Sequence, residues 1–94
     1  PEAKRLSDGT VAGEVILVDH FGNLITNLVA PRGGTVTIAG REIPIVRSYG
    51  AVRPLDVLAV VGASGMVEVA VRDGRAQREL DAERGSTVIL RPRT

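Results

Sequence analysis

The chain has 94 residues, of which 44% are hydrophobic, so it can form one compact domain with a core but not two domains. Twelve Lys and Arg residues against eleven Asp and Glu residues give a net charge of +1, and no long block of one sign occurs, which argues against a strong electrostatic field for nucleic acid or membranes. The chain has no cysteine, which excludes disulfides, thiolate catalysis and cysteine metal ligands.

The N-terminal segment is polar and charged, without an apolar stretch of signal-peptide or membrane-spanning type. We therefore expect residues 1–10 to be a linker from a preceding domain and residues 11–94 to be the folded domain. Residues 11–19 contain the run Val-Ile-Leu-Val, which is apolar on both faces and predicts a central strand covered on both sides.

The next segments read as a second strand and a hairpin. Residues 24–29 form an apolar run that ends at a Pro- and Gly-rich break. Residues 35–39 and 42–46 flank Gly40 and Arg41, a separation suited to a tight hairpin. Pro44 predicts that the second hairpin strand lies at a sheet edge, because proline cannot donate a ladder hydrogen bond.

The C-terminal half continues the strand pattern. Residues 57–61, 66–72 and 87–90 are strand-like, and residues 75–80 are long enough for about one helical turn. Six to seven short strands with frequent turns and at most one short helix predict an all-β fold of barrel or sandwich type.

One polar corner interrupts the first two strands. On strand periodicity Asp19, Phe21 and Asn23 share one face, where they offer an acceptor, an aromatic surface and an amide to a small ligand. A plain turn, in which Asp19 and Asn23 cap backbone groups, explains the same residues. His20 is the one histidine of the chain and points away from its neighbour Asp19 on a strand, so we expect it in solvent rather than in a catalytic dyad or metal site.

Other candidates are scattered. Tyr49 can stack on a base or simply anchor its hydroxyl on backbone. Glu68 and Arg72 are four residues apart on a strand, hence about 13 Å apart and unable to pair with each other. Ser64 lies in a glycine-flanked bend that can bring amides close to a ligand. No nucleophile–base set or metal-spaced cluster is present in the sequence, so we expect no independent catalytic site.

Taken together, the sequence stretches around these candidate residues resemble those of a known family. The matching stretches are Gly13-Glu14-Val15, Asp19-His20-Phe21-Gly22-Asn23-Leu24-Ile25-Thr26-Asn27, Ser48-Tyr49 and Ser64-Gly65-Met66-Val67-Glu68-Val69-Ala70-Val71-Arg72-Asp73-Gly74. They are similar to the C-terminal domain of the S-adenosylmethionine hydrolases, or hydroxide adenosyltransferases, which are related to chlorinases and fluorinases. Leu55 follows Pro54 where that family usually has glycine.

The resemblance implies a C-terminal β-barrel joined to an N-terminal α/β domain in a homotrimer, with the ligand between one subunit's barrel and a neighbour's N-terminal domain. S-adenosylmethionine is then the substrate, and water is favoured over halide because Leu24-Ile25 is hydrolase-like. No metal, additional cofactor, nucleic acid or membrane partner is implied. A cytoplasmic location is expected.

The resemblance also implies roles for individual residues, none of them catalytic. Asn23 would hydrogen-bond the adenine, Tyr49 would stack on it beside Phe21, and backbone around Arg72 and Gly74 would read its edge. Asp19, Ser64 and Glu68 would hold the methionine end. The alternative is a stand-alone barrel that serves as an interaction or nucleic-acid-binding module, against which the two aromatic residues and the near-neutral charge argue.

Overall fold

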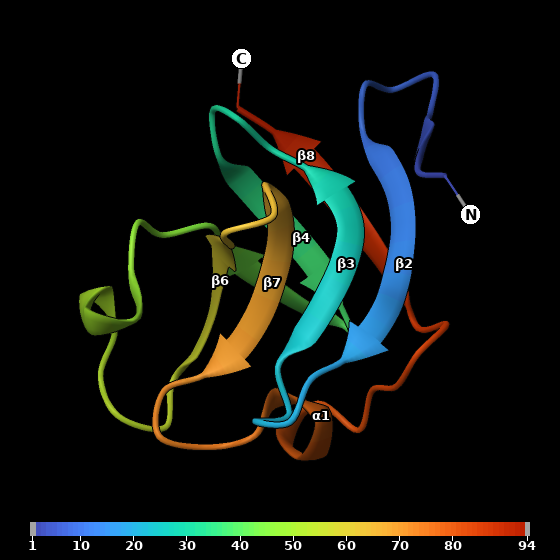
Figure 1. Cartoon of the computed structure of the whole chain (residues 1–94). Helices are drawn as coiled ribbons and strands as arrows, with labels where there is room; N and C mark the ends of the chain where they lie inside the picture. Colours follow the sequence, from blue (N-terminus) through green and yellow to red (C-terminus); the bar gives the residue numbers. More distant parts are fainter. Residues whose placement is uncertain (1, 94) are drawn as a thin grey trace.

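Seven strands follow one another around a single antiparallel sheet in the computed structural model, which describes residues 2–93 (Figure 1). Their spatial order is β5-β4-β8-β2-β3-β7-β6, and a short eighth strand, β1, pairs with β2 outside this path. The strands are β1 (Lys4–Arg5), β2 (Val11–Val18), β3 (Leu24–Val29), β4 (Gly34–Ile38), β5 (Arg41–Pro44), β6 (Val57–Val61), β7 (Met66–Val71) and β8 (Thr87–Pro92).

The two ends of the sheet meet and nearly close it into a barrel. Just beyond β5, Ile45 forms a parallel bridge with Ala59 of β6, and the Val46 amide donates to the Ala59 carbonyl over 2.8 Å. The predicted all-β fold is therefore confirmed as a nearly closed barrel. Pro44 does end an edge strand, since β5 pairs only with β4 along the sheet.

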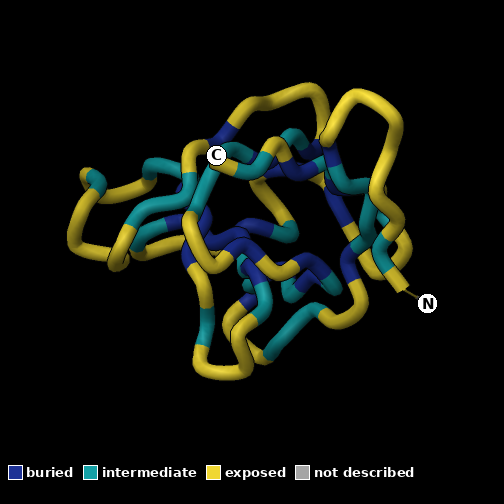
Figure 2. The backbone as a smooth tube through the Cα atoms, turned by 90° about the horizontal axis from the view of Figure 1, so that it is seen from above, coloured by how far each residue is buried: buried dark blue, intermediate teal, exposed yellow. Residues whose placement is uncertain are grey.

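Alternate residues of the strands fill the interior. Leu24, Leu28 and Val69 are fully buried, and a view down the barrel shows the buried positions gathered inside a ring of exposed loops (Figure 2). On the outer side of β6 and β7, a second small cluster of Leu58, Val60 and Ala70 is covered by the segment that contains Val46 and Val52. This outer cover fixes the chain that leads to Tyr49.

The prediction that the first long strand is covered on both sides is wrong. β2 is central, between β8 and β3, but Ile16 is 36% exposed and Leu17 is 55% exposed. The pairing of β2 with β3 shifts register between Val15 and Leu17, which breaks the regular alternation of inward and outward side chains there. The strand therefore presents apolar side chains to solvent.

The predicted hairpin forms, but its turn lies one residue earlier than the expected Gly40 and Arg41. Ile38 pairs with Arg41, so the turn residues are Ala39 and Gly40, with φ of +51° and +74°. Positive φ at both central residues is the geometry that matches the twist of a two-residue hairpin. Because Ala39 accepts this conformation, the second strand starts at Arg41. It ends at Pro44 rather than at Val46.

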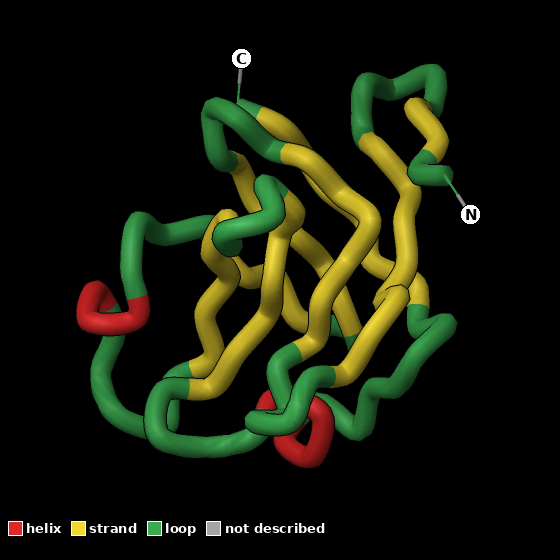
Figure 3. Tube along the Cα trace, in the orientation of Figure 1, coloured by secondary structure: helices red, strands yellow, loops and turns green. Residues whose placement is uncertain are grey.

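The segment predicted as a linker folds back onto the barrel within its described part. β1 pairs with β2, and the Asp8 carboxylate accepts hydrogen bonds from the Thr10 amide (3.0 Å) and hydroxyl (2.6 Å) in the connecting turn. The helical segments are α1 (Ala76–Glu79), slightly shorter than expected, and the 3-10 turn η1 (Tyr49–Ala51), both outside the sheet (Figure 3). Within residues 2–93 no helix has the length and apolar character needed to cross a membrane.

Candidate functional site

The polar corner between β2 and β3 is a tight turn built around Asp19. One carboxylate oxygen of Asp19 accepts the backbone amides of Phe21 and Asn23, each over 2.9 Å, and the other accepts the Asn23 side-chain amide over 3.2 Å. The turn interpretation is thus correct for the carboxylate of Asp19. Ligand binding is still compatible with this turn. The turn positions the Asn23 side-chain amide, and its Oδ1 has no partner among the described residues and can accept a hydrogen bond.

Arg75, which sequence reasoning did not single out, clamps this corner. Gly22 has φ of +80°, and a Cβ there would lie 2.8 Å from the Arg75 Cβ, so the arginine passes directly across the glycine. Its guanidinium donates to the His20 carbonyl over 3.1 Å, and the Gln77 amide donates to the Gly22 carbonyl over 2.9 Å. His20 itself is exposed, as expected.

Beside the corner lies a hollow of about 690 Å³ that contains five of the eight predicted site residues. Phe21 and Tyr49 contribute aromatic rings that are 69% and 44% exposed. These exposed rings offer a stacking surface to a ligand. The predicted residues that line the hollow are Phe21, Asn23, Tyr49, Arg72 and Gly74.

Two of the remaining candidates adjoin this hollow as an acidic group. The Tyr49 phenol is close enough to hydrogen-bond the Glu68 carboxylate, and Asp19 is near enough to act on both electrostatically. Burial, then the charge of Asp19, raise the pKa of Glu68, while the hydrogen bond from Tyr49 partly opposes them. Burial, then Glu68 and Asp19, raise the pKa of Tyr49. Two carboxylates that repel one another form a site suited to a cation, such as an ammonium group.

Arg72 and Gly74 lie at the wall of the hollow, but their polar groups are largely engaged by the protein. The Arg72 guanidinium donates to the Val52 carbonyl, its amide donates to the Asp56 carbonyl, and its own carbonyl accepts from the Leu55 amide. The Gly74 amide donates to the Val71 carbonyl over 3.0 Å. Arg72 therefore holds the β5–β6 connection in place as well as forming the wall.

Ser64 is not brought to the hollow. Its hydroxyl accepts the Met66 amide over 3.3 Å within the β6–β7 turn, at the opposite end of β7 from Arg72. The six residues of β7 correspond to about 20 Å at the usual rise, so the Ser64 hydroxyl lies beyond contact with Arg72. Glu68 bridges part of the gap, because its carboxylate packs against Gly62 in the same turn.

Thr26 and Asn27, the end of the most specific matching stretch, have structural roles. The buried Thr26 hydroxyl donates to the Val67 carbonyl over 2.7 Å and accepts the Leu28 amide over 3.1 Å where β3 and β7 shift register. Asn27 Oδ1 accepts the Glu14 amide over 2.9 Å. A Cβ on Gly13 would lie 2.4 Å from that same oxygen, so glycine is required there. These residues shape the two strands that carry the corner.

The assembled site offers groups that can bind a ligand. It combines two rings, a positioned amide and two carboxylates, which suit a base linked to a cationic group. In residues 2–93 no group of three His, Asp or Glu side chains is placed to hold a metal ion. The expectation that this chain provides no catalytic residue stays a prediction.

Comparison with known proteins gives a consistent result. Residues 13–89 match the model of the SAM hydroxide adenosyltransferase C-terminal domain. Curated relatives include two proteins called (R)-S-adenosyl-L-methionine hydrolase, from Thermus thermophilus (43% identical) and Salinispora tropica (35% identical). The matches cover 83% and 81% of this chain but only 31% and 30% of those relatives, so the chain spans about a third of their length.

Solved structures agree on the fold. A conserved hypothetical protein from Thermus thermophilus superposes with a TM-score of 0.80 at 42% identity, over 85% of this chain and 34% of that one. An uncharacterized conserved protein from Thermotoga maritima has a TM-score of 0.77 at 24% identity over 99% of this chain and 39% of that one, which supports the fold alone. The chain therefore belongs to the family of SAM hydroxide adenosyltransferase C-terminal domains.

Proposed function

We propose that this barrel binds the adenosine and methionine parts of S-adenosylmethionine and forms half of the active site of an enzyme that hydrolyses it to adenosine and methionine. The observation that carries the proposal is the Asn23 amide, held by Asp19 at the edge of a hollow that also contains the Phe21 and Tyr49 rings. A positioned asparagine amide can pair with the N6 and N7 atoms of adenine, and aromatic rings can stack on its face. The names of the curated relatives agree with this ligand.

The acidic group supports a position for the other end of the ligand. Methionine carries an ammonium group, and S-adenosylmethionine carries a positive sulfur. Asp19 and Glu68, beside Tyr49, provide negative charge next to the hollow where these cations would lie. Ser64 lies in the β6–β7 turn away from the hollow, so the proposal for the methionine end is carried by Asp19 and Glu68.

The reaction needs alignment more than local acid–base chemistry. Water attacks the ribose C5′ carbon, a carbon–oxygen bond forms, the carbon–sulfur bond breaks with its electron pair on sulfur, and a proton is released. The leaving thioether is neutral. A barrel that holds adenine and methionine rigidly keeps the breaking bond in line with the nucleophile, an effect worth several kcal/mol. Exclusion of bulk water from the closed site would add to it.

The nucleophile and the rest of the site would come from elsewhere. We propose that an N-terminal α/β domain of a neighbouring subunit closes the hollow in a homotrimer, and that the enzyme acts in the cytoplasm. Exposed apolar side chains beside the site, including Leu17 and Phe21, fit a surface that is covered in the assembly. The small share of the curated relatives that this chain matches fits the same proposal.

The test is adenosine formation from S-adenosylmethionine by the barrel joined to that N-terminal domain. Asn23→Ala and Tyr49→Ala should each lower kcat/KM by at least about tenfold, since each removes a contact of about 1–2 kcal/mol or more to the adenine. The matched control is Arg53→Ala, because Arg53 is exposed and pairs only with Asp56 on the surface. Wild-type rates in both site variants would refute the assignment.

A further inference from the structure

The opposite end of the barrel carries two neighbouring hollows, of about 450 and 490 Å³. β3 runs away from the Asp19 corner and ends at Val29, and its six residues correspond to about 20 Å, so these hollows are separate from the adenosine site. They lie between the β3–β4 turn and the end of β8. Both hollows are lined by the turn residues Ala30, Pro31, Arg32 and Gly33 and by Arg93.

Four arginines surround the two hollows, and we call them the arginine rim: Arg5, Arg32, Arg47 and Arg93. Arg47 lines the first hollow, Arg5 lines the second, and the other two line both. Neither hollow has an acidic residue in its lining. Among residues 2–93 the one ion pair joins Arg53 and Asp56, so none of the four arginines of the rim is ion-paired with a carboxylate of that part of the chain. Four guanidinium groups gathered around hollows that have no acidic lining residue create a positive potential, which a bound anion would reduce.

The backbone beneath these side chains is well ordered by hydrogen bonds. The Gly33 amide donates to the Ala30 carbonyl over 2.9 Å, and the Arg93 amide donates to the Gly33 carbonyl over 3.2 Å. Gly34 approaches β8 so closely that a Cβ would lie 2.2 Å from the Arg91 carbonyl oxygen. Arg32 and Arg93 are therefore carried side by side on two segments that are locked together.

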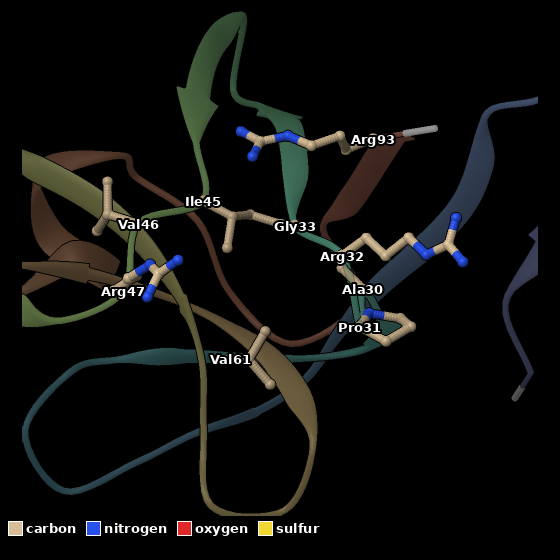
Figure 4. A pocket seen from close by; sticks show the side chains of 9 residues that line it. All are labelled: Ala30, Pro31, Arg32, Gly33, Ile45, Val46, Arg47, Val61 and Arg93. Carbon is tan, nitrogen blue, oxygen red and sulfur yellow. The ribbon is translucent and has the colours of Figure 1, made fainter.

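The arginines point to two adjoining places rather than one. In the view of Figure 4, the Arg47 and Arg93 side chains lie on the side of Ile45, whereas Arg32 extends in the other direction, toward β2. On the Ile45 side, Val46 and Val61 form an apolar wall, and Val61 is 44% exposed. Arg47 and Arg93 thus both line the first hollow and Arg5 and Arg32 both line the second, on either side of a shared turn.

We propose that the arginine rim binds a small anion with two or more linked oxyanion groups, one for each hollow. Guanidinium groups recognise phosphate and carboxylate oxygens through paired N–H donors, and both groups fit the same geometry. A ligand with linked groups matches the two hollows better than a single anion does. This site stands independently of the proposed hydrolase function.

The experiment titrates the 94-residue chain with pyrophosphate at low ionic strength and follows the backbone amide and arginine side-chain signals by NMR. The Gly33 amide and the side chains of Arg32, Arg47 and Arg93 should shift together, and saturation should require at least about tenfold less pyrophosphate than inorganic phosphate. A parallel titration with a linear tricarboxylate identifies the source of the oxyanions. Tighter pyrophosphate binding points to phosphate compounds, and tighter tricarboxylate binding points to organic acids.

The double variant Arg47→Gln/Arg93→Gln should weaken binding by about tenfold or more, since charged hydrogen bonds are lost. The matched control is Arg53→Gln/Arg84→Gln, which removes the same charge from exposed positions outside both hollows. An unchanged amide spectrum of each variant without ligand shows that it is folded. Equal weakening by the control, or equal shifts at all exposed arginines, would overturn the proposal, as would no saturation by any of the anions.

Discussion

At the scale of single residues, Asp19 shows how one side chain serves both interpretations of its sequence. It caps the turn through two backbone amides, and the same carboxylate orients the Asn23 amide toward the hollow. The turn capping could be predicted from residue types, because Asp and Asn favour such corners. The contact of Tyr49 with Glu68 could not, since it joins segments nineteen residues apart across the outside of the sheet.

Glu68 carries a prediction about stability and pH. Its pKa is raised by burial and by Asp19, so ionisation of the Glu68 carboxyl is less favourable in the folded state than in the unfolded chain. The resulting stabilisation is fully present below the unfolded pKa of about 4.3 and is lost as the pH rises through the higher folded pKa. Glu68→Gln should therefore unfold at higher urea concentration than the wild type at pH 7, with a difference that shrinks toward about pH 4.

The control for this measurement is Glu42→Gln, on the exposed part of β5. It removes the same charge away from Asp19. A wild-type midpoint in Glu68→Gln at every pH, or an equal gain in both variants, would show that the acidic group does not oppose folding. Retention of an unfavourable charge would fit a role in binding a cation.

At the scale of elements, the order of hydrophobic runs and turn residues predicted nearly every strand, because short apolar segments between glycines and prolines have few alternatives. The strand predictions were wrong where the backbone departs from regular strand or turn geometry. The register shift in β2 exposes Leu17, and the hairpin uses Ala39 in a conformation that glycine adopts more easily. Close contacts between the strands, such as that of Asn27 with Gly13, form only after the strands have paired and could not be predicted from local sequence.

The turn before β6 contains a second strained residue. The Asp56 amide donates to the Arg53 carbonyl over 3.1 Å, and Leu55, directly after Pro54, has φ of +68°. A turn with proline second and positive φ third favours glycine at the third position. Leu55 is 68% exposed, so it gains little from packing.

Leu55→Gly should therefore stabilise the barrel by about 0.5–1 kcal/mol, the relieved backbone strain less the greater freedom of glycine in the unfolded chain. Thermal unfolding should show a rise in Tm of roughly 2–8 °C for a domain of this size. The comparison is Leu55→Ala, which shortens the side chain but keeps the strained backbone. An equal rise in both variants would assign the effect to the exposed leucine instead.

At the scale of the whole molecule, the folded barrel decides which distant residues lie together, and the linear sequence does not show this. Ser64 lies in the turn at the far end of β7 from the hollow that Asn23 lines, although both residues belong to matching motifs. The barrel also brings together the four arginines of the arginine rim, which come from four separate segments. A chain of net charge +1 therefore has one locally basic end. Even spacing of charge along a sequence therefore does not exclude a charged surface.

The open side of the hollow that we propose for adenosine leads to a prediction for the isolated chain. Phe21 remains 69% exposed, so a bound adenine would be covered on one side only. Calorimetry should detect adenosine binding no tighter than about millimolar for the 94 residues alone, because much of the ligand surface stays in water. Micromolar binding would mean that the barrel is a complete site.

The most direct test of the proposed half-site is a crystal structure, with bound adenosine, of the barrel joined to the proposed N-terminal domain. We predict the adenine beside the Phe21 and Tyr49 rings, with its N6 and N7 atoms at the Asn23 side-chain amide and its ribose facing a neighbouring subunit. Adenosine bound away from Asn23, or enclosed by one subunit alone, would contradict the proposal that this barrel is the adenine-binding half of a shared site.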